Sequence, residues 1–121
     1  MPKQSVTPAV APYLAKKRVR PLGPFTYLLL CTINKLPREL RYGAILEKDL
    51  SEQYGGMIDL AQIYVGLQRL VEKKFITEGK EQQAPTGTKH TVIVYDITKA
   101  GREALTYAAN FYKMLAKAAP N

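Results

Sequence analysis

The sequence predicts a mainly α-helical domain that carries one small β-hairpin. Three observations support this fold class: three successive segments with apolar residues at helical spacing, two short segments with alternating apolar residues, and a long final amphipathic helix. With 121 residues, of which 46% are hydrophobic, the chain can form one compact domain. We expect an N-terminal arm at 1–21, a folded domain at 22–98, and a C-terminal helix and tail at 99–121.

The N-terminal arm is basic and rich in proline. Five of the eight prolines lie within residues 1–24, a density that favours extended backbone. The arm also holds five of the 18 basic residues, whereas the first acidic residue is Glu39. Because the chain carries a net charge of +8, nucleic acid is the expected partner of the arm, and a solvated tail is the alternative. The arm residues expected to contact DNA are Lys16, Lys17, Arg18 and Arg20.

Two helices are predicted between the arm and residue 56. The first should run from Pro24 to Lys35, since proline suits a first helical position and Pro37 prevents continuation. Its inward stripe comprises Phe25, Leu28, Leu29, Thr32, Ile33 and Leu36. The second helix should span residues 42–53 and end at two glycines, with an apolar series of Ile45, Leu46, Leu50 and Tyr54.

A third helix should begin after Asp59, which is a good N-cap. Its expected buried face is Leu60, Ile63, Leu67, Leu70 and Val71. The opposite face should then hold Gln62, Val65, Arg69 and Lys73, with Ala61 and Glu72 beside them and Tyr64 on the flank. A central valine and few acidic residues are unusual for a face that meets only water, so this face is a candidate binding surface.

The remaining segments are a hairpin and a last helix. Residues 75–81 and 90–98 alternate as strands, with a turn-rich loop between them, and Thr98 is a plausible N-cap for the helix. Apolar residues of this helix follow a 3, 4, 3 spacing at Leu105, Ala108, Tyr112 and Leu115, and Ala104, Tyr107, Phe111 and Met114 widen the stripe. So apolar a helix must pack on its own domain or on a second chain.

Several classes of protein are excluded by composition. Cys31 is the sole cysteine and lies in an apolar helical run, where a buried thiol is expected rather than a nucleophile. No nucleophile–base pair, metal-ligand cluster or phosphate-binding glycine loop is present, so we expect neither an enzyme nor a cofactor. The apolar run at 25–36 is too short and too polar to span a bilayer, and the chain begins without a secretory signal. A cytoplasmic protein that does not contact membranes is therefore expected.

Three helices followed by a hairpin are the element order of a winged helix, a variant of the helix-turn-helix. In that motif the second helix of the pair enters the major groove of DNA. The outer face of the third helix would then read base edges: Gln62 could bond adenine, Arg69 could bond guanine or a phosphate, and Val65 could meet a thymine methyl group. Gly66 could allow the helix backbone to approach the duplex closely.

Short motifs appear in a recognisable order along residues 22–105. They are Leu22-Gly23, Tyr42-Gly43, Tyr64-x-x-Leu67-x-Arg69-Leu70-x-x-Lys73, Tyr95-x-Ile97-Thr98 and Gly101-Arg102-x-x-Leu105. Together they resemble the PadR family of bacterial transcriptional regulators. The resemblance implies a winged helix-turn-helix, a homodimer built on the C-terminal helix and, usually, repression. It also implies that a small effector can bind near the dimer interface in members with a single C-terminal helix.

These arguments define three sets of candidate residues. The folded domain is expected to contact double-stranded DNA through Tyr42, Ala61, Gln62, Tyr64, Val65, Arg69, Lys73, Lys89 and His90. The homodimer interface is expected to contain Leu105, Ala108, Phe111, Tyr112 and Leu115. A small aromatic effector would meet Tyr107, Phe111 and Tyr112, although such a stripe is more often plain dimer core.

Two features depart from the family pattern. The β-hairpin of a winged helix is called the wing. Lys74 stands where the family usually has a glycine before the first wing strand, so the turn there is expected to differ. The wing tip is also poor in charge, with only Lys89 and His90 beside it, so the basic arm could replace its phosphate contact. The sequence leaves two alternatives to an effector-controlled regulator that binds a palindromic operator. One is an effector-independent or architectural DNA-binding protein, and the other is a winged helix that binds another protein.

Overall fold

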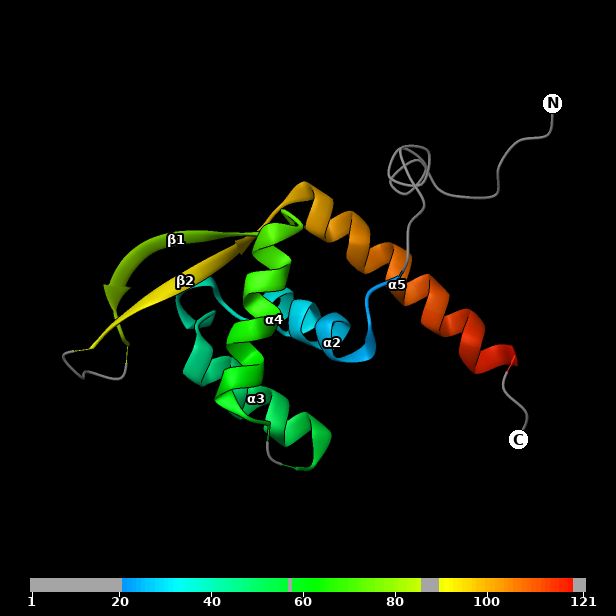
Figure 1. The fold of residues 1–121 in the computed structure, drawn as a ribbon, viewed down its shortest axis with the longest axis horizontal. Coiled ribbons are helices and arrows are strands. Elements are labelled where there is room, and N and C mark those ends of the chain that lie inside the picture. Colours follow the sequence, from blue (N-terminus) through cyan, green and yellow to red (C-terminus); the bar gives the residue numbers. More distant parts are fainter. Residues whose placement is uncertain (1–20, 57, 86–89, 119–121) are drawn as a thin grey trace.

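The computed structural model describes residues 21–56, 58–85 and 90–118. The elements in chain order are α2 (Pro24–Lys35), the short 3-10 helix η1 (Arg38–Leu40), α3 (Gly43–Tyr54), α4 (Leu60–Glu72), β1 (Ile76–Gln83), β2 (Thr91–Ile97) and α5 (Lys99–Ala118). Figure 1 shows α2, α3 and α4 packed together, the antiparallel hairpin to one side, and α5 running away from the hairpin on the other. This is a winged helix, as the sequence predicts.

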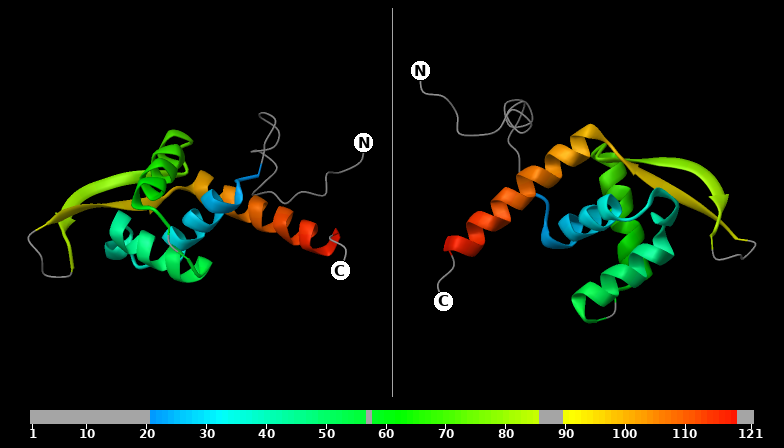
Figure 2. Two further views of the ribbon diagram at one scale, coloured as in Figure 1. Left: turned by 60° about the horizontal axis from the view of Figure 1, so that its bottom comes forward. Right: turned by 180° about the vertical axis from the view of Figure 1, so that it is seen from behind.

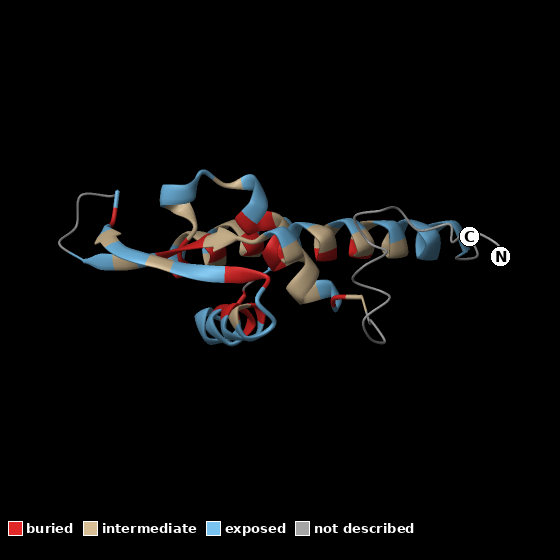
Figure 3. Cartoon of the chain, turned by 90° about the horizontal axis from the view of Figure 1, so that it is seen from above, coloured by how far each residue is buried: buried red, intermediate tan, exposed pale blue. Residues whose placement is uncertain are grey.

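The core lies among α2, α3 and α4, with α2 at its centre. Leu29, Leu30 and Ile33 of α2 are fully buried, and Figure 3 shows the buried positions gathered where the helices meet. The bounds of α2 match the prediction, because Pro24 occupies its first turn and the chain becomes extended at Leu36. Leu30 is absent from the predicted stripe because α2 is covered on more than one side, by α3, α4, α5 and β2, whereas amphipathic spacing identifies a single buried face.

The connection from α3 to α4 is a tight turn. Gly55 caps α3 in the left-handed conformation, with a φ of 71°, as expected for a glycine at this place. Beyond the turn, the hydroxyl of Ser51 accepts a hydrogen bond from the backbone N–H of Ile58 at 2.9 Å. Tyr54, which the sequence places on the apolar face of α3, is instead 44% exposed and meets the ring edge of Phe25.

The hairpin is attached to the helical domain at its base. Ile76 pairs with Ile97 and Gln83 with Thr91, with an irregularity between Glu78 and Glu81. Asp96 in β2 accepts two hydrogen bonds from Arg38 of η1, at 2.7 and 3.1 Å. These contacts fix the wing relative to the helices, so that it projects from the domain in a defined direction.

The turn from α4 to β1 keeps a left-handed helix end. Lys74 has a φ of 65°, the N–H of Lys74 donates to the carbonyl of Val71, and the N–H of Phe75 donates to that of Leu70. These are the two hydrogen bonds of a Schellman motif. The expectation that lysine would alter this turn is therefore wrong: the lysine adopts the conformation that a glycine would favour.

Helix α5 begins at a threonine cap and runs back across α2. The hydroxyl of Thr98 accepts from the N–H of Gly101 at 3.0 Å, which confirms the predicted N-cap. Ala104 and Ala108 are buried in the core, whereas Met114 and Leu115 are 66% and 50% exposed. Figure 2 shows the far end of α5 extending beyond the helical core, on the side opposite the hairpin.

Candidate nucleic-acid interface

Helix α4 presents an exposed stripe along its outer side. Its buried residues are Ile63, Gly66, Leu67 and Leu70. Since an α-helix repeats every 3.6 residues, the positions opposite this face are 61, 65, 68 and 72. Ala61, Val65, Gln68 and Glu72 are all exposed, Val65 by 51%. This stripe is the surface that a duplex or another flat partner would meet first.

The outward direction of α4 differs from the sequence-based expectation. Gly66, expected to face DNA, is buried against α2: a Cβ there would lie 2.7 Å from Leu29 and 3.2 Å from Phe25. Leu60, expected in the core, is 37% exposed. The exposed face is therefore turned toward the hairpin: it is centred on Ala61, Val65 and Glu72, and it includes Gln68, which was absent from the predicted face. Gly66 could have indicated this rotation of α4, because a glycine inside a helical pattern often marks a close packing contact.

Gln62 has a structural task at the start of α4. Its side-chain oxygen accepts a hydrogen bond from the N–H of Asp59 at 3.1 Å, while the Asp59 carboxylate accepts from the N–H of Ala61 at 3.2 Å. This reciprocal arrangement is a capping box. A bidentate bond to adenine needs both the oxygen and the nitrogen of the amide, so Gln62 would have to share with the base the oxygen that already accepts from Asp59.

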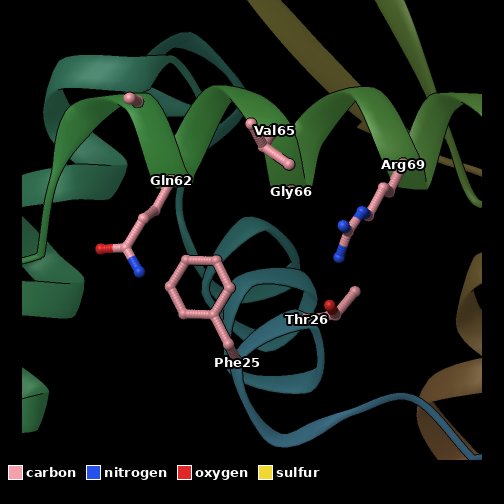
Figure 4. A pocket seen from close by; sticks show the side chains of 7 residues that line it. Phe25, Thr26, Gln62, Val65, Gly66 and Arg69 are labelled. Atoms are coloured by element: carbon pink, nitrogen blue, oxygen red, sulfur yellow. The ribbon is translucent and has the colours of Figure 1, made fainter.

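Arg69 lies beside a small pocket between α4 and the start of α2. The pocket has a volume of about 280 Å³, and its lining includes Phe25, Thr26, Gln62, Val65 and Arg69. Figure 4 shows the Arg69 side chain directed from α4 toward Thr26, with the Phe25 ring on the floor. Within the described residues no ion pair holds Arg69, and its neighbour Glu72 instead accepts a long hydrogen bond of 3.4 Å from Gln68. The internal salt bridge to Glu72 that would compete with a binding role is absent.

Tyr64 occupies the other flank of α4, facing the start of α3. A Cβ added to Gly43 would lie 2.6 Å from the Tyr64 hydroxyl oxygen, so the tyrosine packs over the first turn of α3. It remains 51% exposed. Tyr64 also lines a hollow of about 420 Å³ between α4 and the wing, together with Gln68, Val71, Glu72, Glu78 and Tyr95.

The wing contributes few positive charges to this surface. Glu78 and Glu81 are exposed on β1, with Lys80 between them, and His90 is exposed next to β2. Burial raises the pKa of Tyr95, and the negative charge of Glu78 adds to the rise. Lys89 lies outside the described residues, as do Lys16, Lys17, Arg18 and Arg20 of the arm.

Tyr42 and Lys73 differ in their exposure. Tyr42 is only 5% exposed and belongs to the buried hydrophobic set, so its side chain does not join the exposed surface as expected. Lys73 is exposed at the C-cap of α4. A phosphate could therefore reach Lys73 but not the Tyr42 ring.

The residues assigned to a dimer interface divide into two groups. Ala108 is fully buried in its own chain, so its assignment to an interface is wrong. Tyr112 stacks on Tyr27 with ring centroids 5.1 Å apart, and its hydroxyl donates to the carbonyl of Leu22. Leu105 and Phe111 are half-buried, and Leu115 is exposed. The sequence could not separate these groups, because spacing gives a helix face but not its partner.

The aromatic residues proposed for an effector lie along the same helix. Tyr107, Phe111 and Tyr112 are all half-buried, and the Phe111 and Tyr112 rings meet edge to face at 5.4 Å. Cys31 lies nearby on α2, and burial raises the pKa of its thiol, which keeps it protonated. Neither a membrane-spanning helix nor a cluster of potential metal ligands occurs among the described residues.

A comparison with family models matches residues 29–107 to the transcriptional regulator PadR-like family. The chain belongs to the PadR-like family. A comparison with curated proteins gave no match. Among solved structures, a Thermoplasma acidophilum transcriptional regulator is 24% identical with a TM-score of 0.63, covering 76% of this chain and 82% of that one. H. salinarum RosR is 24% identical with a TM-score of 0.60, covering 84% and 82%. A Streptococcus transcriptional regulator is 21% identical with a TM-score of 0.60, covering 77% and 88%.

Membership of the PadR-like family makes this chain a DNA-binding transcriptional regulator with a winged helix-turn-helix. The family and its structural neighbours are regulators, not enzymes. In this PadR-like protein the matched region runs from the middle of α2 into α5 and includes the whole of α4 and the wing. The surface described above is therefore the part of the chain in which DNA contacts should be sought.

Proposed function

We propose that this PadR-like protein is a homodimeric repressor that binds a palindromic operator through α4. The proposal rests on the first three residues of the exposed stripe, Ala61, Val65 and Gln68, which are flanked by the phenol of Tyr64 and the guanidinium of Arg69 and followed by Glu72 at the end of the helix. An apolar and amide surface with hydrogen-bond donors on both sides suits the major groove, where base edges lie between two phosphate backbones.

Contacts outside α4 would position the protein without specifying sequence. Lys73 and His90 are exposed at the two ends of the α4–wing surface, and Lys89 and the basic arm would add further phosphate contacts. The exposed carboxylates of Glu78 and Glu81 oppose a close phosphate approach to β1. We therefore assign more of the non-specific affinity to the arm than to the wing.

The homodimer would form through the far half of α5. Phe111, Met114 and Leu115 present apolar surface beyond the core of their own domain, and two-fold dimers are the commonest soluble oligomers. Pairing of two α5 helices would place two copies of α4 about one DNA turn apart, roughly 34–36 Å, to match two half-sites. A palindromic operator follows from this symmetry.

A small aromatic effector would bind beside the paired α5 helices. Tyr107, Phe111 and Tyr112 supply half-buried aromatic surface there, and Tyr112 stacks on Tyr27 of α2. An effector bound there would change the angle between the winged-helix domains of the two subunits, and thus the spacing of the two α4 helices. Without such an effector, the protein would instead be a constitutive DNA-binding protein.

Selection of bound sequences from a random duplex library tests the proposal directly. Recovery of a palindrome with half-sites one helical turn apart supports sequence-specific binding by a symmetric dimer. Recovery of unrelated duplexes with strong salt dependence would leave an architectural role. Failure to bind any duplex would favour a protein partner. Release from the selected duplex by small aromatic compounds then tests the effector.

A further inference from the structure

The centre and the flank of α4 offer different chemistry to a partner. Ala61, Val65, Gln68 and Glu72 form its outward line, with the acidic Glu72 at the C-terminal end, whereas Gln62 and Arg69 lie on the flank that faces α2. The major groove is about 12 Å wide, close to the diameter of a helix with its side chains. A helix that fills the groove therefore turns its central line to the base edges and its flanks to the phosphates.

The two glutamines of α4 are not equivalent. The oxygen of the Gln62 amide is bonded to the N–H of Asp59 within the capping box. Gln68 is exposed, and its nitrogen makes only a long bond of 3.4 Å to Glu72. Such a bond breaks at little cost, which leaves the Gln68 amide able to donate and accept together. Of the two, Gln68 is the better suited to bond adenine bidentately, because its amide can turn freely while that of Gln62 is oriented by the cap.

The pocket beside Arg69 has the character of a sugar-phosphate site. Its floor is apolar, made by Phe25, Val65 and the backbone of Gly66. Arg69 and Thr26 face one another at one end of the pocket, and the Gln62 amide lies at the other end, beyond the Phe25 ring (Figure 4). The rim contains no acidic side chain. Donors around an apolar floor fit a phosphate with its deoxyribose.

We propose that Gln68 reads an adenine in each half-site, that Val65 and Ala61 meet thymine methyl groups, and that the Arg69–Thr26 pocket holds one backbone phosphate. This inference rests on the proposed function, because it assumes that α4 enters the major groove. It separates specificity from affinity: the outward line determines sequence, and the α2 flank contributes a contact that every sequence can make. The half-site is accordingly A·T-rich where α4 meets it.

The test compares selected sequences and salt dependence for the full chain and three variants. Wild type should select half-sites with a fixed adenine, and Gln68→Ala should lower the preference for adenine at that position about tenfold. Gln62→Ala is the matched control, since it removes the same amide from the same helix, and it should keep the selected motif. Arg69→Ala should also keep the motif but flatten the slope of log affinity against log salt by about 0.9 per half-site.

The outcomes separate this inference from the function on which it rests. A wild-type palindrome that Gln68→Ala leaves unchanged overturns the inference and supports the proposed function. The inference is also overturned if Arg69→Ala loses its base preference at one position of the operator while the slope of log affinity against log salt stays the same. Arg69 would then read a base. If wild type selects no motif, both proposals fail together. Thermal unfolding of each variant shows whether a loss arises from the fold, and Lys117→Ala controls for a lost surface charge.

Discussion

Gly101, in the first turn of α5, packs so closely on the carbonyl oxygen of Phe75 that no Cβ atom fits between them. The hydroxyl of Thr98 strengthens the same junction, since it donates to the carbonyl of Lys74 at 2.7 Å and accepts from the N–H of Gly101. The end of α4 is thereby joined to the start of α5. Any movement of α5 in a dimer would be transmitted to α4 through this rigid contact.

Substitution of Gly101 by alanine should disturb this junction. The added methyl group collides with backbone, which cannot move aside as a flexible side chain can, so we expect a loss of at least about 2 kcal/mol in the free energy of unfolding. Chemical denaturation measures this loss. Gly56→Ala is the control, because nothing lies within 4 Å of a Cβ there. Equal stability of the two variants would show that α5 can shift away from β1 without cost.

Lys74→Gly should stabilise the protein. Lysine at a φ of 65° bears the strain of the left-handed conformation, which glycine adopts freely. The gain is reduced by the greater entropy of glycine in the unfolded chain, so about 0.5–1 kcal/mol is expected. The adjacent Lys73 has an ordinary φ of −79°. Lys73→Gly should therefore destabilise slightly, and a shift of the same sign in both variants would contradict the strain argument.

The ion pair between Arg38 and Asp96 should make stability depend on pH. Hydrogen bonds from Arg38, followed by the charges of Arg38 and Arg41, hold the pKa of Asp96 below its ordinary value. A carboxylate whose pKa is lowered by folding stabilises the fold above its unfolded pKa, about 3.9, and loses this effect as pH falls through the folded pKa. Wild type should have a higher Tm than Asp96→Asn at pH 7.

That difference in Tm should shrink as the pH falls below about 4 and vanish in stronger acid. Because both side chains are more than a third exposed, the effect should be small and should weaken with added salt. A difference that persists unchanged at low pH would assign the role of Asp96 to hydrogen-bond geometry instead of charge.

Tyr64→Phe should weaken binding to all duplexes alike. The phenol lies over the first turn of α3, where backbone N–H groups and the helix dipole favour a phosphate. Loss of one phosphate hydrogen bond should reduce affinity about tenfold, with the selected motif unchanged. Competition between the selected operator and random duplex measures both effects. A variant with altered sequence preference and full affinity would place Tyr64 on a base.

The element order and most helix ends follow from local chemistry. Pro24, Asp59 and Thr98 each mark the start of a helix in the structure as they do in the sequence, because caps and prolines act within a few residues. The turn glycine Gly55 is likewise found in the left-handed conformation that its place predicts. The change of period after α4 gives the hairpin. Local propensity therefore suffices for the fold class.

The rotation of α4 about its axis does not follow from the sequence. It depends on Gly66, whose missing side chain lets α2 approach, and this brings Gln68 into the exposed face. The same limitation applies to Ala108, where a small residue at a seam position packs on α2 of its own chain. Periodicity identifies an apolar face, but which surface covers that face is a tertiary property.

The last prediction concerns the dimer. Leu115 is 50% exposed, so Leu115→Glu should leave the fold of a single chain unchanged. In a dimer formed through α5 the new carboxylate would be buried without a partner, at a cost of at least about 2 kcal/mol, or roughly thirtyfold in the dissociation constant. Sedimentation equilibrium should give a wild-type dimer and a largely monomeric variant that binds the palindrome weakly.

Lys117→Glu changes charge two residues away and should stay dimeric if Lys117 faces solvent. Wild type that sediments as a monomer at micromolar concentration would defeat both the dimer and the palindrome, since one copy of α4 can meet only one half-site.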